Sequence, residues 1–206
     1  MDGNAVKAMM AAVSEAIIDS VDLLTEADRA TGDGDHGVGM RRGFEAARHA
    51  LETLNEPTPD QVMKSVGTAV MSKGGGASGA IFGTLFRSGA KTLEGKSEFD
   101  AQGLAAFLKA GCEAVQKRGG AGPGQKTMID ALLPAADAAG AGHGSLQDAV
   151  KAAAHAAKDG VEATRSMLAT TGKARSLAER SLGHVDPGAL SVSIILQAMA
   201  DYTAAA

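Results

Sequence analysis

The sequence predicts an all-α protein, arranged as an antiparallel up-and-down barrel or bundle of eight helices. Alanine, the strongest helix former, supplies 42 of the 206 residues, and runs of β-branched residues are scarce. Apolar residues recur at helical spacing along eight segments, and no alternating strand pattern competes with them. The short connections favour antiparallel neighbours, and the length suits one domain, 1–206, around a single core.

The first four helices are expected in the N-terminal half of the chain. The first carries apolar residues from Val6 to Leu24, and the second follows an acidic loop. The third begins after Pro59 and Asp60, which suit a helix start. By their apolar residues, these helices lie over 6–24, 40–54, 62–69 and 78–93.

The last four helices follow the same spacing. The fifth starts at Asp100, and the sixth follows a glycine-rich loop. The seventh starts at Ser145 and is long, and the eighth follows Pro187, a residue suited to the first turn of a helix. These helices lie over 100–115, 128–135, 145–168 and 192–202.

Composition excludes several classes of function. The net charge is −4, no basic stripe is present, and aromatic residues make up only 3%, so nucleic-acid binding is not expected. No segment has the uninterrupted apolar length of a membrane span, and the N-terminus does not resemble a signal peptide. The single cysteine, Cys112, excludes an intrachain disulfide, so a cytoplasmic protein is expected.

Unusual sequences are confined to alternate connections. The connections after the first, third, fifth and seventh expected helices are rich in glycine or acidic residues, whereas the others are plain. In an up-and-down arrangement alternate loops lie at the same end, so the functional site is expected at one rim. The loops of this rim are 28–39, 73–79, 118–127 and 171–188, and the plainer loops lie near 55–60, 94–100 and 140–145.

The first loop of this rim holds three carboxylates, Asp28, Asp33 and Asp35, within eight residues. Mg²⁺ prefers oxygen ligands and usually shares its coordination with waters and substrate phosphates, so the loop is a candidate magnesium site. A calcium EF-hand fails on spacing, because Val38 stands where that motif requires glycine when the loop is counted from Asp33. The alternative is ordinary turn formation, or capping of the second helix by Asp35.

Other features of the rim suit a nucleotide, and each has a plainer alternative. His36 could ligate a metal or contact a nucleotide, or could simply face solvent at a helix start. The stretch 73–79 (KGGGASG) resembles a phosphate cradle, but a flexible link or close helix packing would also use glycine. The stretch 118–127 is not a Walker A loop, because Gln125 stands where that motif has glycine; another nucleotide loop or a helix end with a proline turn remains open. Lys173 could neutralise phosphate or be ordinary surface charge.

Together, these motifs resemble those of the nucleotide-binding L subunit, or L domain, of dihydroxyacetone kinases. The resemblance covers nearly the whole chain, and four motifs occur in order at similar spacing. They are 32–37 (GDGDHG), 75–79 (GGASG) with Gly83 and Thr84, 123–128 (PGQKTM) with Asp130, and 179–189 (ERSLGHVDPGA). The resemblance implies an eight-helix antiparallel barrel with the nucleotide at one end, which agrees with the rim expected from the loops.

By the same resemblance, Asp28, Asp33 and Asp35 hold two Mg²⁺ ions that bind the phosphates of ADP or ATP. The positions that match nucleotide-contacting residues are His36, Gly37, Val38, Gly39, Ala77, Ser78, Gly119, Met128, Lys173, Asp186, Pro187 and Gly188. The chain departs from the family at Lys173, where relatives often have arginine. An arginine can bind phosphate through two N–H groups at once, whereas a lysine interacts with it as a single point charge. The segment 172–178 also lacks the tyrosine that is frequent there. No catalytic residue is assigned to this chain.

The resemblance implies a kinase subunit that transfers a phosphoryl group from bound ATP to dihydroxyacetone, or a related short ketose, held by a separate K subunit. In the phosphotransferase-system type, ADP stays bound as a resident cofactor and is recharged by a phosphohistidine donor protein. A free-standing L chain favours this type. The alternatives are an ATP-dependent kinase subunit with exchanging ATP, a nucleotide-loaded module that regulates by docking, and a purely structural helical protein.

Overall fold

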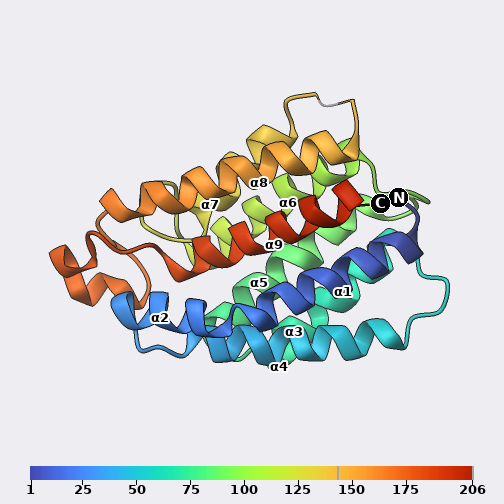
Figure 1. Cartoon of the computed structure of the whole chain (residues 1–206). Coiled ribbons are helices and arrows are strands. Elements are labelled where there is room, and N and C mark those ends of the chain that lie inside the picture. The colour runs from blue at the N-terminus through green and yellow to red at the C-terminus, as the bar shows by residue number, and fades with distance from the viewer. Residues whose placement is uncertain (143, 206) are drawn as a thin grey trace.

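The computed structural model describes residues 1–142 and 144–205, and in it the chain is a bundle of α-helices (Figure 1). The all-α class is confirmed, since the described residues contain no strand. Both termini lie at one end of the bundle, and the α2–α3 loop lies at the other (Figure 1). The elements are α1 (Gly3–Asp19), α2 (Val21–Thr31), α3 (His36–Glu52), α4 (Pro59–Lys73), α5 (Gly76–Ala90), the 3₁₀ helix η1 (Lys91–Leu93), α6 (Ala101–Gly119), α7 (Ile129–Ala139), α8 (Leu146–Ala163), the 3₁₀ helices η2 (Thr164–Ser166) and η3 (Lys173–Ser181), and α9 (Pro187–Ala205).

The segment expected as one helix over 6–24 forms two helices. Ser20 separates α1 from α2 at φ −91° and ψ 9°, and its hydroxyl donates to Ala16 O at 2.7 Å. A serine that bonds back to the carbonyl four residues earlier competes with the helical ladder and bends the chain. The described part of the chain therefore has nine α-helices where eight were expected.

Side-chain caps set several helix starts. Thr58 caps α4 through a reciprocal capping box, Asp100 accepts from the first turn of α6, and Ser145 does so for α8. The last of these helices is shorter than the 145–168 expected from its apolar residues. It ends at Ala163 and passes into η2, which carries the chain toward the site.

Buried apolar side chains from all nine α-helices form one continuous core. Glycines let neighbouring helices approach closely. A Cβ on Gly83 of α5 would lie 2.8 Å from Gly67 O of α4, and one on Gly160 of α8 would lie 2.2 Å from Asp130 O of α7. Because interiors packed this closely deform little, the helix ends that carry the unusual loops are held in fixed positions. Among the described helices, none combines the length and apolarity needed to cross a membrane.

Candidate functional site

Four loops meet around a cavity of about 230 Å³. Each loop of unusual sequence contributes to its lining, with Asp35, Gly75, Thr127 and Gly172 as one representative each. The helices α3, α5, α7 and α9 all begin at this cavity. Because the first N–H groups of a helix have no partner within the helix and carry the positive end of its dipole, four such ends favour an anionic ligand.

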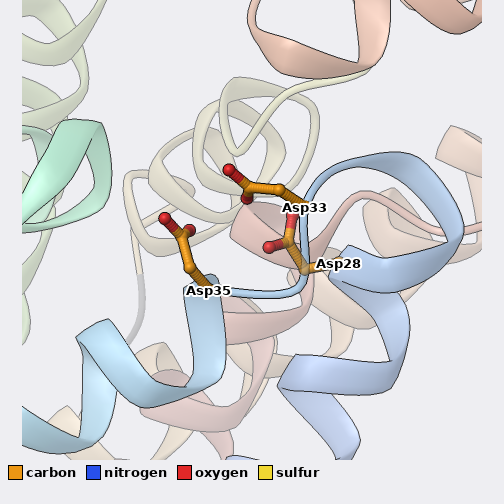
Figure 2. A group of neighbouring side chains, drawn as sticks. All are labelled: Asp28, Asp33 and Asp35. Carbon is orange, nitrogen blue, oxygen red and sulfur yellow. The ribbon is translucent and has the colours of Figure 1, made fainter.

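The acidic loop brings its three carboxylates together. Each of Asp28, Asp33 and Asp35 offers one oxygen, and these oxygens lie within 4.8 Å of one another (Figure 2). Asp28 is buried in the last turn of α2, whereas the other two are exposed. A side chain at position 32 would displace the Asp28 carboxylate, because a Cβ there would lie 2.4 Å from Asp28 Oδ1. An oxygen-only cluster of this kind suits a hard cation such as Mg²⁺.

His36 is buried and does not face solvent, so that alternative is wrong. Its backbone N–H donates to Asp28 Oδ2 at 3.0 Å, which fixes one carboxylate of the cluster. The ring lies 2.8 Å from Ser78 Oγ through Nδ1 and 2.8 Å from Ser191 Oγ through Nε2. Since Ser191 Oγ donates to Pro187 O, a neutral ring donates from Nε2 and accepts from Ser78 at Nδ1. His36 thus joins α3, α5 and α9 and orients the Ser78 hydroxyl at the cavity.

The glycine turn before α5 lies directly on α3. Gly75 and Gly76 have φ of 71° and 54°, the left-handed region that glycine adopts without strain. A Cβ on Gly39 would lie 2.8 Å from Gly74 O, so a side chain at position 39 would push the turn away. Ala77 and Ser78 then form the first turn of α5 at the cavity wall. This arrangement of backbone amides is typical of anion-binding turns.

Hydrogen bonds made by the side chains of Asp130 and Lys126 fix the loop before α7. Asp130 accepts from Gly124 N at 2.5 Å and from Thr127 N at 2.8 Å. Lys126 is buried, and its Nζ donates to Thr164 O and His184 O, each at 2.5 Å. Burial lowers the pKa of Lys126, and Asp186 opposes this effect. Lys126 therefore links three chain segments through hydrogen bonds. The lysine of a Walker A loop instead binds the phosphates of the nucleotide.

The start of α9 completes the cavity. Asp186 caps this helix, because its Oδ2 accepts from Ala189 N at 2.7 Å, and its own N–H donates to Thr164 Oγ1 at 3.0 Å. Burial, with a smaller effect of Asp130, raises the pKa of Asp186 to about 7. Pro187 occupies the first helical position, where its missing N–H costs nothing.

A family model described as the DAK2 domain matches residues 30–201, which is most of the chain. The chain belongs to the DAK2 domain family.

Relatives of this DAK2 chain are described as kinase subunits. It is 38% identical over 185 residues to the "PEP-dependent dihydroxyacetone kinase 1, ADP-binding subunit DhaL" of Listeria innocua, covering 90% of this chain and 89% of the relative. It is 35% identical over 182 residues to the corresponding DhaL subunit of Escherichia coli, covering 87% of each protein.

A crystal structure of the dihydroxyacetone kinase from C. freundii, in complex with AMP-PNP and Mg²⁺, matches this DAK2 chain with a TM-score of 0.76 at 25% identity. The match covers 98% of this chain and 34% of that chain. This protein therefore has the fold of about one third of the solved kinase.

Most predicted site residues of the DAK2 chain lie at the cavity, and Asp33 joins them through the acidic cluster. Gly37 instead packs on α2, where a Cβ would lie 2.3 Å from Val21 O. Val38 and Gly119 also lie outside the lining, and the side chain of Lys173 lies outside the described residues. The predicted residues that line the cavity are Asp28, Asp35, His36, Gly39, Ala77, Ser78, Met128, Asp186, Pro187 and Gly188.

Further lining residues were not predicted individually. Helical spacing could have found some of them, because Arg42 follows Asp35 by seven residues and Ile81 follows Ser78 by three. The others depend on contacts between distant loops. The lining residues that fall within the loops expected at the rim are Thr31, Gly74, Gly75, Gly76, Lys126, Thr127, Thr171, Gly172 and Ala174, and those outside these loops are Arg42, Ile81 and Phe82.

Asp186 should make stability fall as the pH rises. Its pKa is about 7 in the folded protein and ordinarily 3.8, so the folded state holds this proton more tightly than the unfolded state. The resulting stabilisation is complete below pH 4 and is lost by about pH 7, a change of roughly 2–4 kcal/mol. Urea unfolding of wild type and Asp186→Asn between pH 4.5 and 8 checks this, since the amide keeps the helix cap but cannot titrate. Parallel pH profiles for the two proteins would contradict it.

Ala178 is strained within η3 and should be improved by glycine. Its φ of 48° and ψ of −125° lie in a region that an L-residue with a side chain rarely adopts. Ala178→Gly should therefore raise the free energy of unfolding by roughly 1 kcal/mol, and thermal unfolding measures the change. Ala174→Gly, in the same element without positive φ, is the control and should destabilise. A loss of stability in both variants would show that Ala178 is not strained.

Proposed function

We propose that this DAK2 chain is the nucleotide- and magnesium-binding subunit of a kinase for dihydroxyacetone or a related short ketose. The observation that carries the proposal is the convergence of an acidic cluster, a glycine turn and four helix starts at one cavity. Carboxylates suit Mg²⁺ and convergent backbone amides suit phosphate, which together match a nucleotide polyphosphate. Residues 1–206 would act as one such domain, and the descriptions of the DhaL relatives support this function.

Asp28, Asp33 and Asp35 would hold two Mg²⁺ ions. Their donor set fits, because all three supply oxygen and lie within 4.8 Å, and a single Mg²⁺ usually takes only one or two carboxylates from a protein. When bound, the ions would clamp the phosphates and offset charge that develops on the leaving oxygen. The bond from His36 N–H keeps the Asp28 carboxylate in place for this role.

The remaining residues of the cavity would position the nucleotide, since phosphoryl transfer asks a protein mainly for positioning and charge stabilisation. His36 would act through the Ser78 hydroxyl that it orients. The amides of the glycine turn would face the phosphates, and Lys173 would supply positive charge. The proposed nucleotide-binding residues that line the cavity are His36, Gly39, Ala77, Ser78, Met128, Asp186, Pro187 and Gly188. Gly37, Val38, Gly119 and Lys173 are proposed from the resemblance to the kinase L subunits.

The ketone would be held by a separate K-type subunit that docks at this end of the bundle. ADP would stay bound as a resident cofactor and be recharged by a phosphohistidine donor protein in the cytoplasm. The "PEP-dependent" description of the Listeria relative supports this mode over free exchange of ATP. The buried thiol of Cys112, whose pKa burial raises to about 11, would stay unreactive in a reducing compartment.

Native mass spectrometry of the purified protein tests this function. We expect one ADP and two Mg²⁺ ions to be retained, and we expect ketone phosphorylation when a K subunit, dihydroxyacetone and a phosphohistidine donor are added. Failure to bind nucleotide at any Mg²⁺ concentration would overturn the kinase function. Rapid exchange of bound ADP for free ATP would overturn only the resident-cofactor mode.

A further inference from the structure

Arg42 lines the cavity but is not among the residues to which the proposed function assigns a role. It lies on α3 with Gly39, and Asp35 is the N-cap residue of this helix; both of these residues also line the cavity. Spacings of four and three residues place these positions on one face of the helix. At a rise of 1.5 Å per residue, Arg42 lies about 10 Å along the helix axis from Asp35. Arg42 therefore lies on the same wall of the cavity as Gly39, about two helical turns from the start of the helix at the acidic cluster.

The guanidinium of Arg42 lies against the glycine turn. A Cβ on Gly75 would lie 3.0 Å from Arg42 Nη2, so a side chain at position 75 would push the arginine aside. One helical turn earlier, Gly39 supports the same glycine turn at Gly74. Arg42 and the amides before α5 therefore form a single wall, at the place where phosphate is proposed to bind.

No ion pair within the described residues engages the positive charge of Arg42. By contrast, its neighbour Arg41 pairs with Glu45 at 3.9 Å. Lys126, the other cation in the described lining, is buried and donates to two backbone carbonyls. Of the lining cations that the structure describes, Arg42 is thus the one available to a ligand.

We propose that Arg42 binds the terminal phosphate of the nucleotide and favours the triphosphate over the diphosphate; this rests on the proposed function. Three carboxylates offset most of the charge of two magnesium ions, so the metals alone leave the phosphates of ATP with a net negative charge. A guanidinium suits this charge, because its fork of N–H groups can bind two phosphate oxygens at once. The third phosphate of ATP adds the charge that Arg42 would recognise.

Binding of MgADP and MgATP to the full chain, measured by titration calorimetry, tests this proposal. Arg42→Gln should weaken MgATP binding about tenfold and MgADP binding less than about threefold. Arg42→Lys should recover part of the lost affinity, since it restores the charge without the fork. Arg41→Gln is the matched control: it removes an adjacent exposed arginine that does not line the cavity and should bind both nucleotides like wild type.

The outcomes separate this proposal from the function on which it rests. If wild type binds neither nucleotide, the proposed function fails. If wild type binds but Arg42→Gln matches Arg41→Gln, only the role of Arg42 fails. An equal loss for ADP and ATP would also overturn it, because the guanidinium would then not recognise the terminal phosphate. Arg42 is exposed, so the variants should unfold at the wild-type temperature.

Discussion

Asp33→Asn should weaken Mg²⁺-dependent binding of ADP roughly 100-fold while leaving the fold intact. The amide has nearly the shape of the carboxylate but lacks the negative charge that holds a magnesium ion. Asp33 is exposed, so the substitution removes no buried packing. Calorimetric titration of ADP at several Mg²⁺ concentrations measures the loss, and thermal unfolding without nucleotide checks the fold.

Asp22→Asn provides a matched control for this experiment. Asp22 is an exposed carboxylate in the first turn of α2, and it lies outside the acidic cluster. Its substitution changes the net charge by the same amount, so general electrostatic effects appear in both variants. If ADP binding depends on Mg²⁺ in the same way for Asp33→Asn and Asp22→Asn, the acidic cluster is not the metal site. The kinase function then loses its main support.

The placement of the site could be predicted from the sequence because it depends on topology. Helical spacing and short connections are enough to make alternate loops share one end. The unexpected break at Ser20 did not disturb this result. Figure 1 shows why: α2 continues beyond α1 toward the site end, so the break does not reverse the direction of the chain. The acidic loop therefore reached the predicted rim.

The roles of individual residues were harder to predict, because they depend on partners that are distant in the sequence. The hydrogen bond from His36 to Ser191 spans 155 residues, and no local pattern indicates it. The local sequence left open whether His36 ligates a metal, contacts a nucleotide or faces solvent at a helix start. Gly37 shows the same limit, since it matches a nucleotide-contacting position by motif but packs against α2 in the structure. The motifs identified which types of residue form the site, whereas the contacts of each residue depend on the fold.

Lys126→Met should be the most destabilising of the substitutions considered. Methionine is unbranched and one heavy atom shorter than lysine, and it cannot donate, so Thr164 O and His184 O would lose their shared partner. Two unpaired carbonyls and the lost attraction to Asp186 should lower the free energy of unfolding by roughly 3 kcal/mol. Urea unfolding measures this loss. Lys158→Met, at an exposed position on α8, should change stability by less than about 0.5 kcal/mol.

The same substitution should weaken nucleotide binding, although Lys126 is not proposed to contact the nucleotide. Its ammonium group joins the loop before α7, the start of η2 and the segment before α9, and these segments supply Met128 and Asp186 to the cavity. Without the hydrogen bonds of Lys126, nucleotide binding must also order these loops. The free energy that this ordering costs weakens the affinity. Addition of MgADP should therefore raise the unfolding temperature of Lys126→Met less than that of wild type. An unchanged affinity despite lower stability would show that the loops are positioned independently of Lys126.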